Sequence, residues 1–243
     1  DRVEYPINSG YIQVVAEERA LPAFWAHPDT GGTFPGVVVI HEHWGLTAHV
    51  RRLVRHLAEV GHYVVAPDLF DGHHPETLDA ARQREAGLAE TGPSYVAAAI
   101  TALRTHHHCN GDIALVGYGM GGRLALHLAV HRDDLKAAVI FQADASPYLA
   151  LLPATTTPIL GFYDRAGEAM AEGDLATLDA QLKTASPSNA LVLYDGVGRY
   201  FCDETRPEYA PEVAADAWAR ALDFLSQRLT GPSQPPDIRH RTY

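Results

Sequence analysis

Short apolar runs alternate with stretches of helical periodicity along most of this chain. Residues 36–40 read Gly-Val-Val-Val-Ile, a continuous apolar run typical of a strand buried on both faces. Residues 47–60 follow with apolar side chains at helical spacing, namely Val50, Leu53, Val54, Leu57 and Val60. The alternation continues to residue 229, so the pattern predicts an α/β class: a mostly parallel, twisted sheet with helices on both faces.

The same pattern places the other elements. Further strands are predicted at residues 11–16, 21–26, 63–66, 113–116, 135–141, 158–162 and 190–194. Helices are predicted at residues 47–60, 75–90, 93–106, 122–130, 175–184 and 212–229. The first two strands, residues 11–16 and 21–26, are both expected to be edge strands. Residues 1–230 are predicted to form one domain, and residues 231–243, rich in proline and polar side chains, a loosely ordered tail.

A glycine occupies the position where a catalytic side chain is expected. Residues 112–123 read Asp-Ile-Ala-Leu-Val-Gly-Tyr-Gly-Met-Gly-Gly-Arg, an apolar strand, a glycine-rich turn and the start of a helix. A strand, a tight turn and a helix in this order form a nucleophile elbow, whose middle residue is normally Ser or Cys. Here the middle residue is Gly119, which has no side chain to attack a substrate.

Charge and composition exclude several classes of function. Nineteen Lys and Arg residues against 30 Asp and Glu residues give a net charge of −11, which argues against nucleic acid and anionic membrane as partners. The two cysteines, Cys109 and Cys202, form no disulfide framework and suit the cytoplasm. No apolar stretch is long enough for a membrane span. We therefore expect a small-molecule partner and a monomer or homodimer.

Cofactor motifs are not found in the sequence. No G-x-G-x-x-G follows the first strand and there is no P-loop, so no nucleotide or flavin is expected. The imidazoles of His41 and His43 flank the carboxylate of Glu42 in the sequence. A metal site at these histidines would need a third ligand that the sequence does not place, so no metal is expected. Residues 106–108 are three histidines at a predicted helix C-terminus, where the helix dipole favours them.

Ligands of parallel sheets bind at the carboxyl ends of the strands, which selects the loops at residues 41–47, 117–121, 163–170 and 195–203. In the first loop, Glu42 or His43 is a candidate general acid or base, and the alternative is that Glu42 is a structural hydrogen-bond acceptor beneath the elbow. If the strand continues through this loop, His41 and His43 share one side and Glu42 faces the other.

The loop at residues 195–203 offers groups that bind anions. Arg199 can hold a carboxylate or an enolate through paired hydrogen bonds, and Tyr200 can assist. The alternative is a salt bridge from Arg199 to Asp164, Glu168 or Asp203. Large side chains near the four loops are expected to line an apolar pocket: Trp44, Tyr118, Met120, Tyr163 and Phe201.

Four segments together resemble the dienelactone hydrolase family of the α/β-hydrolase fold: residues 36–45, 63–70, 116–123, and 194–201 with the helix that follows. The resemblance implies a Cys–His–Asp triad, from which this chain departs. Gly119 stands at the nucleophile and Arg199 at the histidine. The position of the aspartate falls on Gly167, with Asp164 or Glu168 as displaced equivalents, whereas Glu42 retains an acidic residue of the family.

These observations support three hypotheses. The first is a non-hydrolytic enzyme that promotes cyclisation, isomerisation or dehydration of an apolar, carbonyl-bearing molecule. An Ala-, Arg- and Gly-rich composition suggests a GC-rich bacterial genome, and the resemblance to divergent members of the family then implies a polyketide or other secondary-metabolite pathway. Its site would combine the backbone N–H groups of Met120 and of the 42–45 loop, Glu42 or His43 for protons, and Arg199 or Tyr200 for an anion. The second is a non-catalytic binding protein. The third is a hydrolase with a relocated nucleophile, Cys202 or Tyr118.

Overall fold

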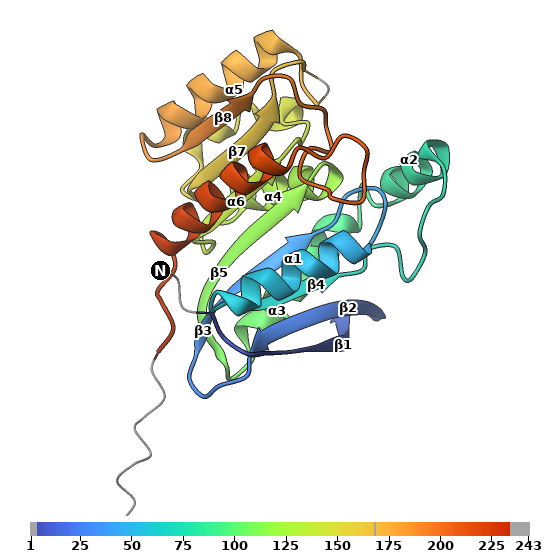
Figure 1. Ribbon diagram of the computed structural model, residues 1–243, viewed down its shortest axis with the longest axis vertical. Helices are drawn as coiled ribbons and strands as arrows, with labels where there is room; N and C mark the ends of the chain where they lie inside the picture. Colours follow the sequence, from blue (N-terminus) through green and yellow to red (C-terminus); the bar gives the residue numbers. More distant parts are fainter. Residues whose placement is uncertain (1–3, 168, 234–243) are drawn as a thin grey trace, which may run out of the picture.

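Eight strands form one sheet in the computed structural model, which describes residues 4–167 and 169–233 (Figure 1). The strands are β1 (Ile7–Ala16), β2 (Arg19–Pro28), β3 (Phe34–Ile40), β4 (Tyr63–Pro67), β5 (Cys109–Tyr118), β6 (Ala137–Phe141), β7 (Ile159–Asp164) and β8 (Ala190–Tyr194). Their order is β1-β2-β4-β3-β5-β6-β7-β8. The pairs β1–β2 and β2–β4 are antiparallel and every other neighbouring pair is parallel, which confirms the predicted mostly parallel sheet.

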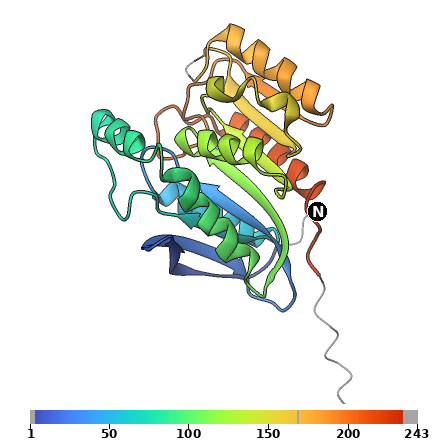
Figure 2. The same cartoon turned by 180° about the vertical axis from the view of Figure 1, so that it is seen from behind.

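Helices cover both faces of the sheet. They are α1 (Ala48–Glu59), α2 (Leu78–Gly87), α3 (Gly92–Arg104), α4 (Met120–His131), α5 (Glu172–Ala185) and α6 (Pro211–Ser226). Two single 3₁₀ turns lie at Ser146–Tyr148 and Leu152–Ala154. Helices α1 and α6 pack on one face (Figure 1), and α3, α4 and α5 pack on the other (Figure 2). Helix α2 extends from the edge formed by the carboxyl ends of the parallel strands.

Strand β3 shows why its sequence is apolar at every position. All seven of its residues are buried. Val38 and Ile40 join the core under α3, α4 and α5, whereas Val37 and Val39 join the core under α1 and α6. Side chains alternate between the two faces of a strand, so a central strand with helices on both faces needs apolar residues throughout.

Several boundaries differ from the prediction. Strand β2 is not an edge strand, because it pairs with β1 on one side and β4 on the other. Helix α2 begins at Leu78 and not at residue 75, since the Thr77 hydroxyl caps it by accepting a hydrogen bond from the N–H of Ala80 at 3.2 Å. Helix α3 ends at Arg104, so residues 106–108 follow the helix in a turn and are not part of it.

The end of the described chain lies against the β2–β3 connection. The Ser233 N–H donates a hydrogen bond to the Thr33 carbonyl at 2.9 Å, and the Thr33 N–H donates one to the Ser233 hydroxyl at 2.8 Å. Most of the predicted tail, residues 234–243, lies outside the described residues. Among the helices of the described chain, none combines the length and apolar character that a membrane span requires.

Candidate functional site

The turn between β5 and α4 has the strained backbone of a nucleophile elbow. Gly119 lies there at φ 52° and ψ −113°, a conformation that is costly for a residue with a side chain. Its N–H donates to the Phe141 carbonyl at 2.8 Å, and its carbonyl accepts from the N–H of Arg123 at 3.0 Å. Gly121 is needed for a different reason, since a Cβ there would lie 2.1 Å from the Ile40 carbonyl oxygen of β3. The elbow is therefore retained although its nucleophile is missing.

Two charged side chains lie directly above the missing nucleophile. A Cβ built on Gly119 would be 3.0 Å from Nη2 of Arg199 and 3.1 Å from Oε2 of Glu42. Arg199 belongs to the loop after β8, and Glu42 to the loop after β3. The glycine therefore does not leave open room above the turn, because a guanidinium and a carboxylate occupy most of that space.

Glu42 is held in a state that suits proton transfer. Burial raises its pKa from 4.5 to about 7, and the positive charges of Arg199 and Arg206 oppose this rise only in part. Its side chain is 17% exposed, and among the described residues Oε1 has no hydrogen-bond partner. A carboxyl group with a pKa close to neutral can both donate and accept a proton under physiological conditions.

His43 forms a hydrogen-bonded chain with two aromatic residues. Its Nε2 lies 3.2 Å from the Tyr200 hydroxyl, which also accepts a hydrogen bond from Nε1 of Trp44 at 3.3 Å. Burial, reinforced by nearby arginines, lowers the pKa of His43 to about 4, so the imidazole is neutral near pH 7 and accepts a hydrogen bond from the Tyr200 hydroxyl. This neutral ring orients Tyr200, and Glu42 is the better candidate for proton transfer.

Strand β3 ends at Ile40, so the expected alternation through the next loop does not occur. The condition for placing Glu42 and His43 on opposite sides is therefore not met, and His43 Nε2 and Glu42 Oε1 lie 3.9 Å apart. His41 instead points into the core, where its Nε2 accepts a hydrogen bond from the Leu69 N–H at 3.0 Å. Burial lowers the pKa of His41, consistent with a structural and uncharged imidazole.

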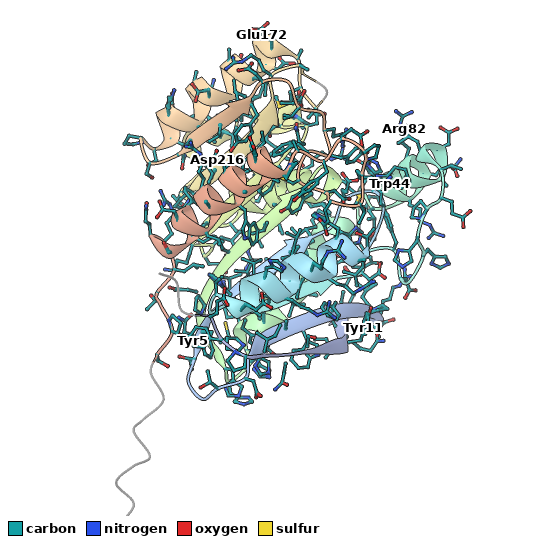
Figure 3. The ribbon with its side chains drawn as sticks, viewed as in Figure 1. Tyr5, Tyr11, Trp44, Arg82, Glu172 and Asp216 are labelled. Carbon is teal, nitrogen blue, oxygen red and sulfur yellow. The ribbon has the colours of Figure 1, made fainter. Side chains whose placement is uncertain are left out.

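Sequence reasoning missed two charged residues that reach this site. The guanidinium of Arg206 lies 4.3 Å from the centre of the Trp44 ring, within the range of a cation–π contact. Glu85 of α2 pairs with Arg123 at 2.8 Å, and its second oxygen lies 4.0 Å from Nδ1 of His43. Figure 3 shows Trp44 at the edge of the sheet from which α2, carrying Arg82, extends. No sequence motif marks α2 as part of the site.

Gln142 is a further residue that sequence reasoning missed. It follows β6 with φ 53°, a left-handed conformation uncommon for a non-glycine residue. Its side chain is buried, and neither its amide oxygen nor its amide nitrogen has a hydrogen-bond partner among the described residues. Backbone strain and an unsatisfied buried amide are both costly, and such costs concentrate at functional sites.

A narrow pocket above Gly119 brings most of the predicted residues together. Its open space is about 30 Å³, room for about one water molecule. The predicted residues that line it are Glu42, Trp44, Tyr118, Gly119, Arg199, Tyr200 and Phe201, and Gln142 and Asp203 join them. Compact polar groups fit this space as it stands, and a larger ligand requires a side chain such as Arg199 to move.

Three predicted site residues are placed differently. The Met120 and Tyr163 side chains pack in the core under α3, α4 and α5, so the prediction that they line the pocket is wrong. The backbone N–H of Met120 still opens helix α4, where the first N–H groups have no partner within the helix. Asp164 is buried at the end of β7 outside the pocket lining, and Glu168 lies outside the described residues.

The two candidates for a relocated nucleophile are not activated. Burial, together with Asp203 and Glu204, raises the pKa of the Cys202 thiol well above its usual range. Burial also raises the pKa of the Tyr118 hydroxyl, whose ring stacks on Phe141 at 4.4 Å. Both groups therefore stay protonated near neutral pH, where a thiolate or phenolate would be needed for attack.

One group of side chains in the described chain could hold a metal ion. His49, Asp203 and Glu204 bring one ligand atom each within 4.8 Å of one another. Glu204 is already paired with Arg52, and its other oxygen lies 2.5 Å from Nδ1 of His49. The carboxylate is thus engaged by a guanidinium and an imidazole, an arrangement that orients His49 and disfavours a cation.

Known proteins resemble this chain over most of its length. The profile of the "Dienelactone hydrolase family" matches residues 21–229. A "Putative carboxymethylenebutenolidase" of Salmonella typhi is 27% identical over 237 residues, covering 91% of this chain and 88% of that protein. A carboxymethylenebutenolidase of Pseudomonas putida is 29% identical over 202 residues, covering 79% and 85%.

A solved structure agrees with the fold. A dienelactone hydrolase-like promiscuous phosphotriesterase from metagenomic libraries superposes with a TM-score of 0.81 at 17% identity, covering 92% of this chain and 99% of that one. This likeness confirms the predicted α/β-hydrolase fold. The family match covers well over half of the residues and includes the β3 loop, the elbow and α6. The chain therefore belongs to the dienelactone hydrolase family.

Proposed function

We propose that this chain binds a mostly apolar small molecule carrying a carbonyl group and transfers a proton on it without forming a covalent acyl intermediate. The outcome would be a cyclisation, an isomerisation or a dehydration. The observation that carries this proposal is the place of Arg199 and Glu42, whose charged groups lie where a nucleophile's side chain would begin. A role in a polyketide or other secondary-metabolite pathway stays a prediction from composition and the family resemblance.

The chemistry would divide between two side chains and the backbone. The N–H of Met120 and one from the 42–45 loop would polarise the carbonyl oxygen. Glu42, as carboxylate, would remove a proton from the carbon beside the carbonyl, and the resulting enolate would be held by Arg199. The carboxyl group of Glu42 would then return the proton to another carbon in an isomerisation, or to a departing hydroxide, as water, in a dehydration.

Two further residues would position the ligand. Tyr200 is fixed by hydrogen bonds to His43 and Trp44, so its ring and hydroxyl are held at one wall of the pocket. Gln142 offers a buried amide whose donors and acceptor are unused among the described residues. A polar ligand atom beside this amide would satisfy groups that otherwise cost about 1–3 kcal/mol to leave unpaired.

A non-catalytic binding protein is the second candidate. The narrow space above Gly119 favours it, because a substrate must displace a side chain before it reaches the backbone donors. Arg199, at the position of the family's histidine, cannot serve as a base, since its guanidinium stays protonated at any physiological pH.

The test uses α-angelica lactone, a compact enol lactone with an acidic proton beside its carbonyl. In deuterated buffer, proton transfer yields the conjugated five-membered isomer, β-angelica lactone, with deuterium incorporated, whereas hydrolysis yields levulinate, and proton NMR distinguishes them. We expect isomerisation or deuterium exchange above buffer, lost in Glu42→Gln and retained in Glu90→Gln, a surface carboxylate control. Levulinate as the enzymatic product would contradict the proposal, and saturable binding with no conversion would favour the binding protein.

A further inference from the structure

A second, larger cavity lies beside the elbow pocket and is lined by residues of α1 and α6. These two helices cover the same face of the sheet (Figure 1). The volume of the cavity is about 340 Å³, within the range of roughly 300–1,000 Å³ for small-molecule sites. Most of its walls are apolar or aromatic, including Leu53, Tyr118, Phe141, Pro211, Ala215 and Trp218. It shares His49, Tyr118, Phe141 and Cys202 with the elbow pocket, so these four side chains separate the two spaces.

His49 is the polar residue buried in this shared wall. Its side chain is 8% exposed, and Nδ1 lies 2.5 Å from a Glu204 oxygen. Arg52 binds the other oxygen of Glu204, which fixes the carboxylate. Because a carboxylate only accepts hydrogen bonds, Nδ1 carries a proton and donates a hydrogen bond to Glu204.

Nε2 of His49 is buried and has no hydrogen-bond partner among the described residues. A buried polar atom without a partner is costly, and it often marks a site that a ligand completes. With Nδ1 turned to Glu204, Nε2 is the ring nitrogen left for a ligand, and His49 lines both cavities. The ring also stands edge-on to Tyr118, 6.0 Å between centres, which belongs to both cavities.

We propose that the cavity between α1 and α6 binds an apolar ring or chain that carries a hydroxyl group, and that Nε2 of His49 accepts the hydrogen bond of this hydroxyl. Aromatic and alanine walls suit the apolar body of the ligand, and the His49–Glu204 pair supplies one fixed acceptor. The proposal does not depend on the chemistry at Gly119, because it concerns binding at a different cavity.

The test measures how tightly the wild-type protein binds three two-ring probes: 2-naphthol, 2-methylnaphthalene and 2-acetonaphthone. They share an aromatic body and differ in carrying a hydroxyl donor, a methyl group or a carbonyl acceptor. Trp218 lines the cavity, so quenching of its fluorescence reports binding there, and this signal should persist in Trp44→Phe and disappear in Trp218→Phe. We expect 2-naphthol to bind about 10-fold more tightly than 2-methylnaphthalene.

Variants then identify the acceptor. His49→Phe keeps a ring in place but removes Nε2, and should reduce the affinity for 2-naphthol to that for 2-methylnaphthalene. His131→Phe, at an exposed histidine of α4, should leave all three affinities unchanged. Equal binding of 2-naphthol and 2-methylnaphthalene by the wild type, or tighter binding of 2-acetonaphthone, would overturn the proposal without any variant. Because the readout is binding, this result would leave the proton-transfer chemistry at the elbow standing.

Discussion

Replacing Gly119 with alanine tests whether the elbow is strained and occupied. The new Cβ would lie 3.0 Å from Nη2 of Arg199 and 3.1 Å from Oε2 of Glu42, so both side chains must move by a few tenths of an ångström. The tips of long side chains can move this far, and the main cost is the backbone at φ 52°, about 1–3 kcal/mol for a non-glycine residue. We therefore expect Gly119→Ala to lower the free energy of unfolding by about 1–3 kcal/mol.

The assay is urea unfolding at pH 7, with a thermal scan as a second readout. For a chain of this size, each kcal/mol lowers Tm by roughly 2–4 °C. Gly173→Ala is the matched control, because Gly173 lies in α5 at negative φ with no atom within 4 Å of its Cβ position. That control should be neutral or stabilising by up to about 1 kcal/mol. If Gly119→Ala proved as stable as the wild type, the strained and crowded elbow described above would be refuted.

The other predictions concern charge, the nucleophile and Gln142. The pKa of Glu42 is about 7 in the folded chain against an ordinary 4.5, so its stabilising effect is complete below about pH 4.5 and is lost as pH rises through 7. Glu42→Gln should therefore exceed the wild type in urea stability at pH 9, by up to about 3 kcal/mol at about 1.4 kcal/mol per pKa unit, and match it at pH 4.5; an equal difference at both values would contradict this. Gly119→Cys should hydrolyse p-nitrophenyl acetate by turnover only if Glu42 serves as the base, because Arg199 cannot act as one; sustained release of nitrophenolate that persists when Glu42→Gln is added would show a base that we have missed. Gln142→Gly should raise stability by about 1 kcal/mol in urea unfolding by relieving φ 53°, and slow the reaction of α-angelica lactone; a destabilised variant would mean that the Gln142 side chain holds the fold.

The buried strands could be predicted from the sequence because a strand that is covered on both faces is apolar at every position. The apolar run at β3 and the glycine pattern at 117–121 each correspond to a steric demand: helices on both sides of β3, and the backbone of Ile40 against Gly121. The order of the strands in the sheet leaves no comparable pattern in the sequence. The position of β2 inside the sheet depends on its pairing with β4, which lies about 40 residues away in the chain.

The sequence also does not indicate on which face of the sheet the pocket opens. Phe141 and Phe201 belong to the core under α1 and α6 and line the pocket, whereas Tyr163 and Met120 belong to the opposite core. All four follow or end elements at the same edge of the sheet, so position along the chain does not separate them. Gln142 and Glu85 acquire their roles through a left-handed backbone and a tertiary contact, and neither leaves a local pattern.

In the proposed function, no residue of this site forms a covalent acyl adduct with the substrate. Intact-protein mass spectrometry after a short incubation with p-nitrophenyl butyrate and an acid quench measures this directly. We predict that the mass of the protein stays unchanged, because Gly119 has no nucleophile and burial keeps Cys202 and Tyr118 protonated. A stoichiometric butyryl adduct that maps to Cys202 or Tyr118 would contradict the account and make this chain a covalent hydrolase.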